Sequence, residues 1–187
     1  RTGLGITAEG DMRAALGMRH GSEKANDLAV EVQQNLAVEA YRSSVNMASE
    51  RGAFPIYDTK REENNPMIDR IRTVDPELYA LMAKVGRRNI SLLTIAPTGT
   101  TSLMTQTTSG IEPVFLPFYI RRRKVNPNDK NAVITFKDDV GDCWEEYYVF
   151  HHKFLTWCEV NGIPAEDVKK MSVKDVEALV EKSPYHR

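Results

Sequence analysis

Hydroxyl side chains gather in one segment of the chain, Thr94–Pro113, which reads TIAPTGTTSLMTQTTSGIEP. Between Pro97 and Pro113 the segment carries eight threonine and serine residues and a single charged residue. Hydroxyl groups donate hydrogen bonds, and Gly99 among them leaves the backbone open to a ligand. A helix that starts here would add free backbone N–H groups, which favour an anion. This combination suits a phosphate group, although the same residue types also serve simply as helix caps.

The run directly before this segment is short and apolar. Asn89–Ala96 reads NISLLTIA and is bounded by two arginines and by Pro97. Its length favours a buried strand over a helix, so we expect the hydroxyl-rich loop at the carboxyl end of a strand. That is the edge at which α/β folds bind ligands. The loop is not a Walker phosphate loop, because the Gly-Lys-Ser/Thr ending is missing.

The remaining pattern predicts a helix-rich α/β fold. Asp75-Pro76-Glu77 has the residue order of a helix start, and the apolar spacing after Ser22 indicates a long helix. A helix followed by a buried strand is typical of a parallel sheet. The expected helices are 8–16, 23–51, 76–85, 143–160 and 173–182, and a hairpin is expected between 114–125 and 131–139, with its turn at 126–131.

The composition is that of an ordinary globular protein. With 187 residues, 41% of them hydrophobic, and a formal net charge of -1, the chain fits one domain and gives no reason to expect a nucleic-acid partner. No apolar run approaches the roughly 20 residues of a membrane span, and there is no signal-peptide pattern, so no membrane is expected. The two cysteines form no C-x-x-C motif, which favours a reducing, cytoplasmic location.

Three other features resemble functional sites but have simpler explanations. Cys143 and Cys158 lie in a helical pattern, and we interpret both as structural thiols. His151 and His152 are adjacent, so on a helix they would point about 100 degrees apart and could not chelate one metal. The basic run Arg121–Lys124 would alternate between the two faces of a strand, which favours a solvated or interface face over the steering of phosphate. We therefore predict no metal site.

Three blocks of sequence, in a fixed order, carry a resemblance to one enzyme family. The first is GLGITAEGDMRAALGMRHGSEKA, starting at Gly3, and the second is AYRSSVNMASERGAFPIYD, starting at Ala40. The third is IAPTGTTSLMTQTTSGIEPVFLPFYIRR, starting at Ile95. Together they resemble the large chain of ribonucleotide reductases. The sequence of the third block is similar to that of the adenosylcobalamin-dependent class II type, whose loop typically reads Ala-Pro-Thr-Gly-Thr/Ser and then Ser-Gly-Ile/Leu-Glu-Pro.

The resemblance implies a fold and a site. Residues 1–123 would belong to the family's ten-stranded α/β barrel, as a fragment of its C-terminal half, and 124–187 would be a hairpin and helical insertion of the same domain. The family's radical motif, Asn-x-Cys-x-Glu, is missing from the chain, so no catalytic residue is expected in it. In this family the matching loop binds the phosphates of the substrate, which assigns that role to Pro97, Thr98, Gly99, Thr100, Thr101 and Ser102.

The function implied by the resemblance is therefore that of one part of a ribonucleotide reductase, which reduces ribonucleotides to deoxyribonucleotides by radical chemistry. The implied cofactor is adenosylcobalamin, although no motif in the chain binds it. The implied partners are a ribonucleotide, a thioredoxin-like reductant and the remainder of the barrel, and the isolated chain is expected to be inactive. Class II against class I, and diphosphate against triphosphate substrates, stay open. The alternative is a non-catalytic helical module that binds a nucleotide or a protein partner.

Overall fold

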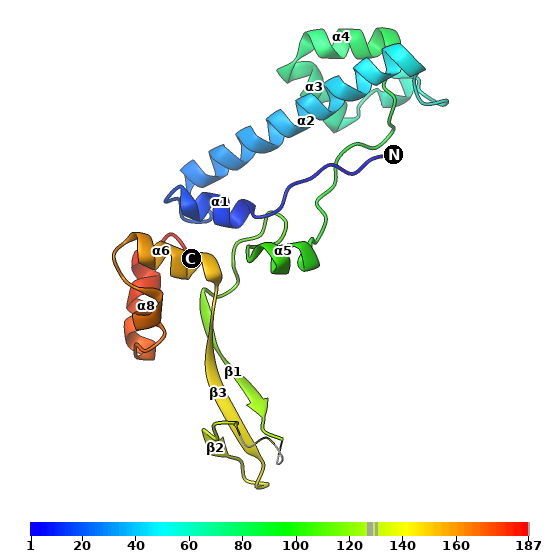
Figure 1. The fold of residues 1–187 in the computed structure, drawn as a ribbon. Helices are drawn as coiled ribbons and strands as arrows, with labels where there is room; N and C mark the ends of the chain where they lie inside the picture. The colour runs from blue at the N-terminus through cyan, green and yellow to red at the C-terminus, as the bar shows by residue number, and fades with distance from the viewer. Residues whose placement is uncertain (127–128, 130, 187) are drawn as a thin grey trace. The chain divides into compact units, whose positions relative to one another are not determined.

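The chain folds into two compact units. The computed structural model describes residues 1–126, 129 and 131–186, and Figure 1 shows them as a ribbon. The first unit contains Arg1–Thr7 and Glu23–Thr98, and the second contains Ala8–Ser22 and Gly99–Arg187. Each unit is built from two stretches of chain. The hydroxyl-rich loop lies where the chain passes from the first unit to the second.

Helices form most of the first unit. Its long helix is α2 (Glu23–Arg51), and α4 (Pro76–Val85) packs against both α2 and α3 (Pro66–Val74). The helices predicted at 23–51 and 76–85 are thus confirmed, whereas α3 was not predicted. The apolar faces of these helices share one core, whose buried members are Tyr41, Val45, Ile68, Ile71, Leu78, Met82 and Leu92.

Side-chain caps set the starts of the two shorter helices. The side chain of Asn65 accepts a hydrogen bond from the backbone N–H of Met67 at 3.0 Å, and α3 begins with a proline directly after it. The carboxylate of Asp75 accepts from the N–H of Leu78 at 2.9 Å in the same way before α4. A short 3-10 helix, η1 (Thr59–Glu62), precedes both. The cap of α3 was overlooked because the same residues, Asn-Asn-Pro, are also typical of a turn.

The run expected to be a buried strand, Asn89–Ala96, is extended but largely exposed. Leu4 and Leu93 form one parallel bridge, in which the N–H of Leu4 donates to the carbonyl of Leu92 at 2.8 Å. Leu92 is buried, but Ile95 is 58% exposed. The predicted burial is therefore wrong, because the described residues of the first unit supply this run with a single pairing partner. The parallel direction of that pairing agrees with the αβ interpretation.

A three-stranded antiparallel sheet lies in the second unit. Its strands are β1 (Phe118–Lys124), β2 (Phe136–Lys137) and β3 (Cys143–Phe150), in the order β1-β3-β2. The predicted hairpin between 114–125 and 131–139 is wrong, because both segments pair with β3 instead of with each other. Residues 127, 128 and 130 of the predicted turn lie outside the described residues.

The helix predicted over 143–160 is wrong in its first half. That half is β3, and α6 (His152–Val160) begins only after His151. The sequence CWEEYYVF is rich in aromatic residues, which favour a strand once a partner strand is present. The ring of Phe150 stacks on that of Phe118 across the strand pair at 6.0 Å between centroids, and Trp144 stacks on Phe136 at 6.3 Å. Pairing with β1 and β2 therefore overrides the helical pattern.

Four short helices complete the second unit: α1 (Glu9–Ala15), α5 (Gly99–Thr105), α7 (Ala165–Val168) and α8 (Val173–Lys182). The predictions for 8–16 and 173–182 are confirmed, and the hydroxyl of Ser172 caps α8. Among the described residues, no helix has both the length and the apolar character needed to cross a bilayer. The buried core of this unit consists of Ala14, Phe154, Cys158, Val168, Val176 and Tyr185.

Candidate functional site

The start of the hydroxyl-rich loop is fixed to the N-terminal glycine turn. The N–H of Thr94 donates to the carbonyl of Leu4 at 2.9 Å, and four residues later the hydroxyls of Thr98 and Thr7 are 2.9 Å apart. Gly5 permits this close pairing, because a Cβ there would lie 2.2 Å from the carbonyl oxygen of Thr94. Sequence reasoning missed Thr7, since its partner lies 91 positions further along the chain.

The backbone turns sharply at Thr98. This residue has φ of 40°, in the left-handed region, whereas Gly99 after it does not. Gly99 opens α5, and a Cβ added to it would meet no atom within 4 Å. Open space beside a helix start is what a ligand that approaches the backbone requires.

Gly99–Ser102 form the first turn of α5. The first N–H groups of a helix have no acceptor inside the helix, and those of Gly99, Thr100 and Thr101 have none among the described residues. The hydroxyl of Ser102 donates to the carbonyl of Gly99 at 2.8 Å and is thus already used. Thr100 and Thr101 are exposed, and their hydroxyls have no partner among the described residues. The available donors are therefore the N–H groups of Gly99, Thr100 and Thr101 and the hydroxyls of Thr100 and Thr101. The hydroxyl of Ser102 serves the helix itself, and that of Thr98 is engaged with Thr7.

The two ends of the loop belong to different units. Pro97 and Thr98 are the last residues of the first unit, and Gly99 is the first residue of this stretch of the second. The six predicted residues are consecutive, so the chain itself keeps them together. Pro97 is exposed and lies outside any helix or strand.

Helix α1 holds the segment that follows α5. The guanidinium of Arg13 donates to the carbonyl of Ile111 at 2.7 Å. Gly10 allows close approach here, because a Cβ would lie 2.3 Å from the carbonyl oxygen of Glu112. Asp11 and Thr108 exchange two further hydrogen bonds. The sequence analysis missed the role of Asp11, because its partners lie 97 or more positions away and no local sequence pattern indicates them.

His151, Cys158 and most of the basic run are already paired or buried. His151 precedes α6 and is not helical, and its Nε2 lies 2.7 Å from the carboxylate of Asp11. Cys158 is buried in α6, and burial raises the pKa of its thiol to about 11, as suits a structural thiol. The basic run Arg121–Lys124 lies in β1, as expected, and ion pairs join Arg122 to Glu146, Arg123 to Glu145 and Lys124 to Asp142.

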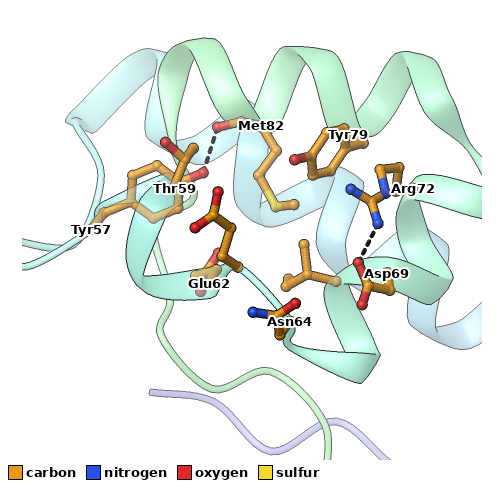
Figure 2. A pocket seen from close by; sticks show the side chains of 10 residues that line it. Tyr57, Thr59, Glu62, Asn64, Asp69, Arg72, Tyr79 and Met82 are labelled. Carbon is orange, nitrogen blue, oxygen red and sulfur yellow. Dashed lines mark hydrogen bonds and ion pairs between the residues drawn. The ribbon is translucent and has the colours of Figure 1, made fainter.

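A small cavity of about 120 Å³ lies in the first unit, beside η1, α3 and α4 (Figure 2). Charged and aromatic side chains line it, and two of its three carboxylates are in ion pairs. Asp69 pairs with Arg72 at 2.6 Å, and the carboxylate of Glu62 pairs with the buried guanidinium of Arg87 at 2.5 Å. The hydroxyl of Tyr57 donates to the carbonyl of Met82. We assign no ligand to this cavity, because these polar groups already serve the fold.

Comparison with known proteins identifies the family. The family model described as "Ribonucleotide reductase, barrel domain" matches residues 1–172. The chain therefore belongs to the family of ribonucleotide reductase barrel domains.

Several curated relatives carry reductase names. The "Vitamin B12-dependent ribonucleoside-diphosphate reductase" of Mycobacterium tuberculosis (strain CDC 1551) is 34% identical over 122 residues, which are 65% of this chain and 15% of that protein. The protein of the same name from Thermoplasma acidophilum is 29% identical over 122 residues, 65% of this chain and 13% of the relative. The "Ribonucleoside-diphosphate reductase subunit alpha" of Treponema pallidum is 25% identical over 125 residues, 65% of this chain and 15% of the relative. The matched part is thus a small share of each relative's length.

Proposed function

We propose that this chain is the part of a ribonucleotide reductase that holds the substrate phosphates, in an enzyme that reduces ribonucleotides to deoxyribonucleotides by radical chemistry. Membership of the barrel-domain family supports the assignment to a reductase. The names of the Mycobacterium and Thermoplasma relatives support a vitamin B12-dependent enzyme that acts on ribonucleoside diphosphates.

The observation that carries the phosphate assignment is the start of α5. Thr98 turns the chain in a left-handed conformation, and the next three residues offer N–H groups without an acceptor among the described residues. The exposed hydroxyls of Thr100 and Thr101 stand beside them. Phosphate oxygens accept hydrogen bonds from such groups, and the dipole of the helix start favours their negative charge. We infer that Pro97–Ser102 hold a phosphate in this way.

The contribution of such a loop to catalysis is positional. Holding the phosphates fixes the ribose relative to the reacting groups, and correct placement lowers a barrier by several kcal/mol. The described residues contain no group of three or more His, Cys, Asp or Glu arranged for a metal ion. Cys158 is buried, with its pKa raised to about 11, which is unsuited to redox exchange. We therefore assign no residue of this chain to adenosylcobalamin.

The remainder of the enzyme would complete the fold. We propose that residues 1–123 belong to the ten-stranded barrel and that 124–187 are an insertion in it. The exposed parallel-paired run Asn89–Ala96 would then be a barrel strand, and Ile95 would be covered by neighbouring strands that are not among the described residues. A thioredoxin-like reductant and the cofactor would bind to other parts of the same enzyme, in the cytoplasm.

Nucleotide affinity of the full-length enzyme tests this proposal. Thr100→Val removes one hydroxyl and should weaken binding by about 1–3 kcal/mol, as the loss of one hydrogen bond to a charged group. Gly99→Val should weaken it further, because a β-branched side chain would fill the open space beside the backbone. Thr156→Val, which removes an exposed hydroxyl from α6, is the matched control.

The four ribonucleotides must be measured separately. Phosphate contacts carry no information about the base, so both loop variants should lose affinity equally for all four. Unchanged affinities would exclude the loop as the phosphate site. A loss confined to one base would instead assign the loop to base selection.

A further inference from the structure

We propose that Asp11 is a positioning residue for the phosphate loop: it fixes Thr108, and through Thr108 it fixes the place of α5. The inference rests on the function proposed above and extends it to a residue in a different helix, α1. Asp11 does not touch the loop residues Pro97–Ser102 that we assign to the phosphate. It acts through the segment that follows them.

The carboxylate of Asp11 is buried and accepts three hydrogen bonds. One oxygen accepts from the backbone N–H of Thr108 at 2.8 Å. The other accepts from Nε2 of His151 at 2.7 Å and from the hydroxyl of Tyr185 at 3.1 Å. The side chain of Asp11 is 7% exposed. A buried carboxylate that is fully hydrogen-bonded holds its donors firmly, because each donor would lose its partner on moving away.

The backbone of Asp11 completes a reciprocal pair. Its N–H donates to the hydroxyl oxygen of Thr108 at 3.2 Å, while its carboxylate accepts from the N–H of the same threonine. Two bonds in opposite directions fix both the position and the orientation of Thr108. His151 and Tyr185 hold the carboxylate from the other side, and the rings of these two residues contact each other at 5.6 Å between centroids.

The charge state of Asp11 suits this role. Burial by itself raises the pKa of the carboxyl, but the hydrogen bonds from His151 and Thr108 outweigh burial, so that the pKa lies below its ordinary value of 3.8. The carboxylate is therefore ionised at neutral pH and can only accept hydrogen bonds. Burial and the neighbouring carboxylate raise the pKa of Tyr185, so its hydroxyl remains a donor.

Helix α5 needs an anchor of this kind. It has seven residues and buries only Ser102, while Leu103 and Met104 are 80% and 81% exposed. Its C-terminal end is tied to the chain that follows, since the N–H of Thr107 donates to the carbonyl of Ser102 at 3.0 Å. Thr108 is the next residue. Only two residues separate Thr108 from the end of α5, and one of them, Thr107, is hydrogen-bonded to the helix. A shift of Thr108 would therefore move α5 and the N–H groups of its first turn.

Asp11→Asn in the full-length enzyme is the central test. An amide has one accepting oxygen and one donating NH₂ group, whereas the carboxylate accepts on both sides. With its NH₂ group toward Thr108, the asparagine faces the donating backbone N–H. With its NH₂ group toward His151 and Tyr185, it keeps a bond from Thr108, but the bond to an anionic oxygen becomes a weaker bond to a neutral amide oxygen. We expect KM for a ribonucleoside diphosphate to rise about tenfold, as one lost charge-assisted hydrogen bond predicts, with kcat within about twofold.

Two further comparisons isolate the effect. Asp139→Asn changes an exposed aspartate between β2 and β3 and should leave KM unchanged. Thr108→Val removes the oxygen that accepts from Asp11 and should raise KM, whereas Thr108→Ser keeps that oxygen and should stay within about twofold of wild type. Thr108→Val also keeps the test decisive if Asp11→Asn does not fold.

The outcomes separate this inference from the function on which it rests. A raised KM in Asp11→Asn and Thr108→Val, with the serine variant and Asp139→Asn close to wild type, supports the positioning role. If Thr100→Val raises KM but Asp11→Asn and Thr108→Val lower only thermal stability, Asp11 is structural and the inference is wrong. If Thr100→Val itself leaves KM and nucleotide affinity unchanged, the proposed function fails and the positioning role fails with it.

Discussion

Removing the negative charge of Glu62 should destabilise the first unit strongly. Glu62 lines the cavity in Figure 2. Its carboxylate accepts two hydrogen bonds of 2.5 Å from the guanidinium of Arg87. The side chain of Arg87 is 4% exposed and that of Glu62 is 14% exposed. The guanidinium also lies 5.3–5.8 Å from the ring centroids of Tyr41, Phe54 and Tyr57. The aromatic rings attract the cation but cannot neutralise its charge.

The size of the effect follows from the burial of the pair. Loss of one partner from a buried ion pair raises the free energy of the folded state by about 3–5 kcal/mol, because a charge is left without compensation. Glutamine at position 62 keeps one accepting oxygen, and the site is slightly exposed. We therefore expect Glu62→Gln to lower the free energy of unfolding by about 3 kcal/mol, which is more than a hundredfold in the unfolding equilibrium.

Urea unfolding of the 187-residue chain, followed by circular dichroism, measures this change, since α2 and α4 dominate the helical signal of the first unit. The neighbouring substitution Glu63→Gln removes an exposed charge and should alter stability by less than about 0.5 kcal/mol. Arg87→Met should also destabilise, and the double variant Glu62→Gln/Arg87→Met should lose less than the sum of the two single changes. Equal effects of Glu62→Gln and Glu63→Gln would refute the reasoning.

Three other predictions concern the second unit. Because the pKa of Asp11 is lowered from 3.8, its negative charge stabilises the fold above pH 3.8, and this stabilisation is lost as the pH falls through the lowered pKa. The difference in melting temperature between wild type and Asp11→Asn should therefore shrink in acid. A difference that does not change with pH would contradict this. At about pH 8, iodoacetamide should alkylate Cys158 roughly a hundredfold more slowly in the folded chain than in urea, because burial raises the pKa of its thiol from 9.0 to about 11. Peptide mass spectrometry measures both rates. Equal rates would show that burial has no effect on this thiol. Gly10→Ala should destabilise the folded chain by about 1–3 kcal/mol, because the added Cβ would lie 2.3 Å from the carbonyl oxygen of Glu112. Gly99→Ala should be tolerated, because a Cβ there would meet no atom within 4 Å. A lower melting temperature for Gly99→Ala than for Gly10→Ala would contradict this reasoning.

Features encoded within a few neighbouring residues could be predicted from the sequence. The start of α4 follows from Asp75 and the proline after it, and the start of α8 follows from Ser172, because each cap bonds to an N–H only three residues away. The candidate loop Pro97–Ser102 was likewise recognised because its donors are consecutive. Its role in binding phosphate stays a prediction.

Features that depend on distant partners were decided only by the tertiary structure. The pattern of Cys143–Phe150 is amphipathic as a helix, whereas a strand places one glutamate on each face, and pairing with β1 and β2 nevertheless selects the strand. Asn89–Ala96 has the composition of a buried strand, yet its burial depends on neighbours that the described residues of its unit do not provide. Asp11 reads as an ordinary acid in the first turn of a helix, and its partners lie 97, 140 and 174 positions away. A hydrogen bond between residues a few positions apart can be recognised from the types of those residues. A contact between residues about a hundred positions apart forms only when the chain has folded.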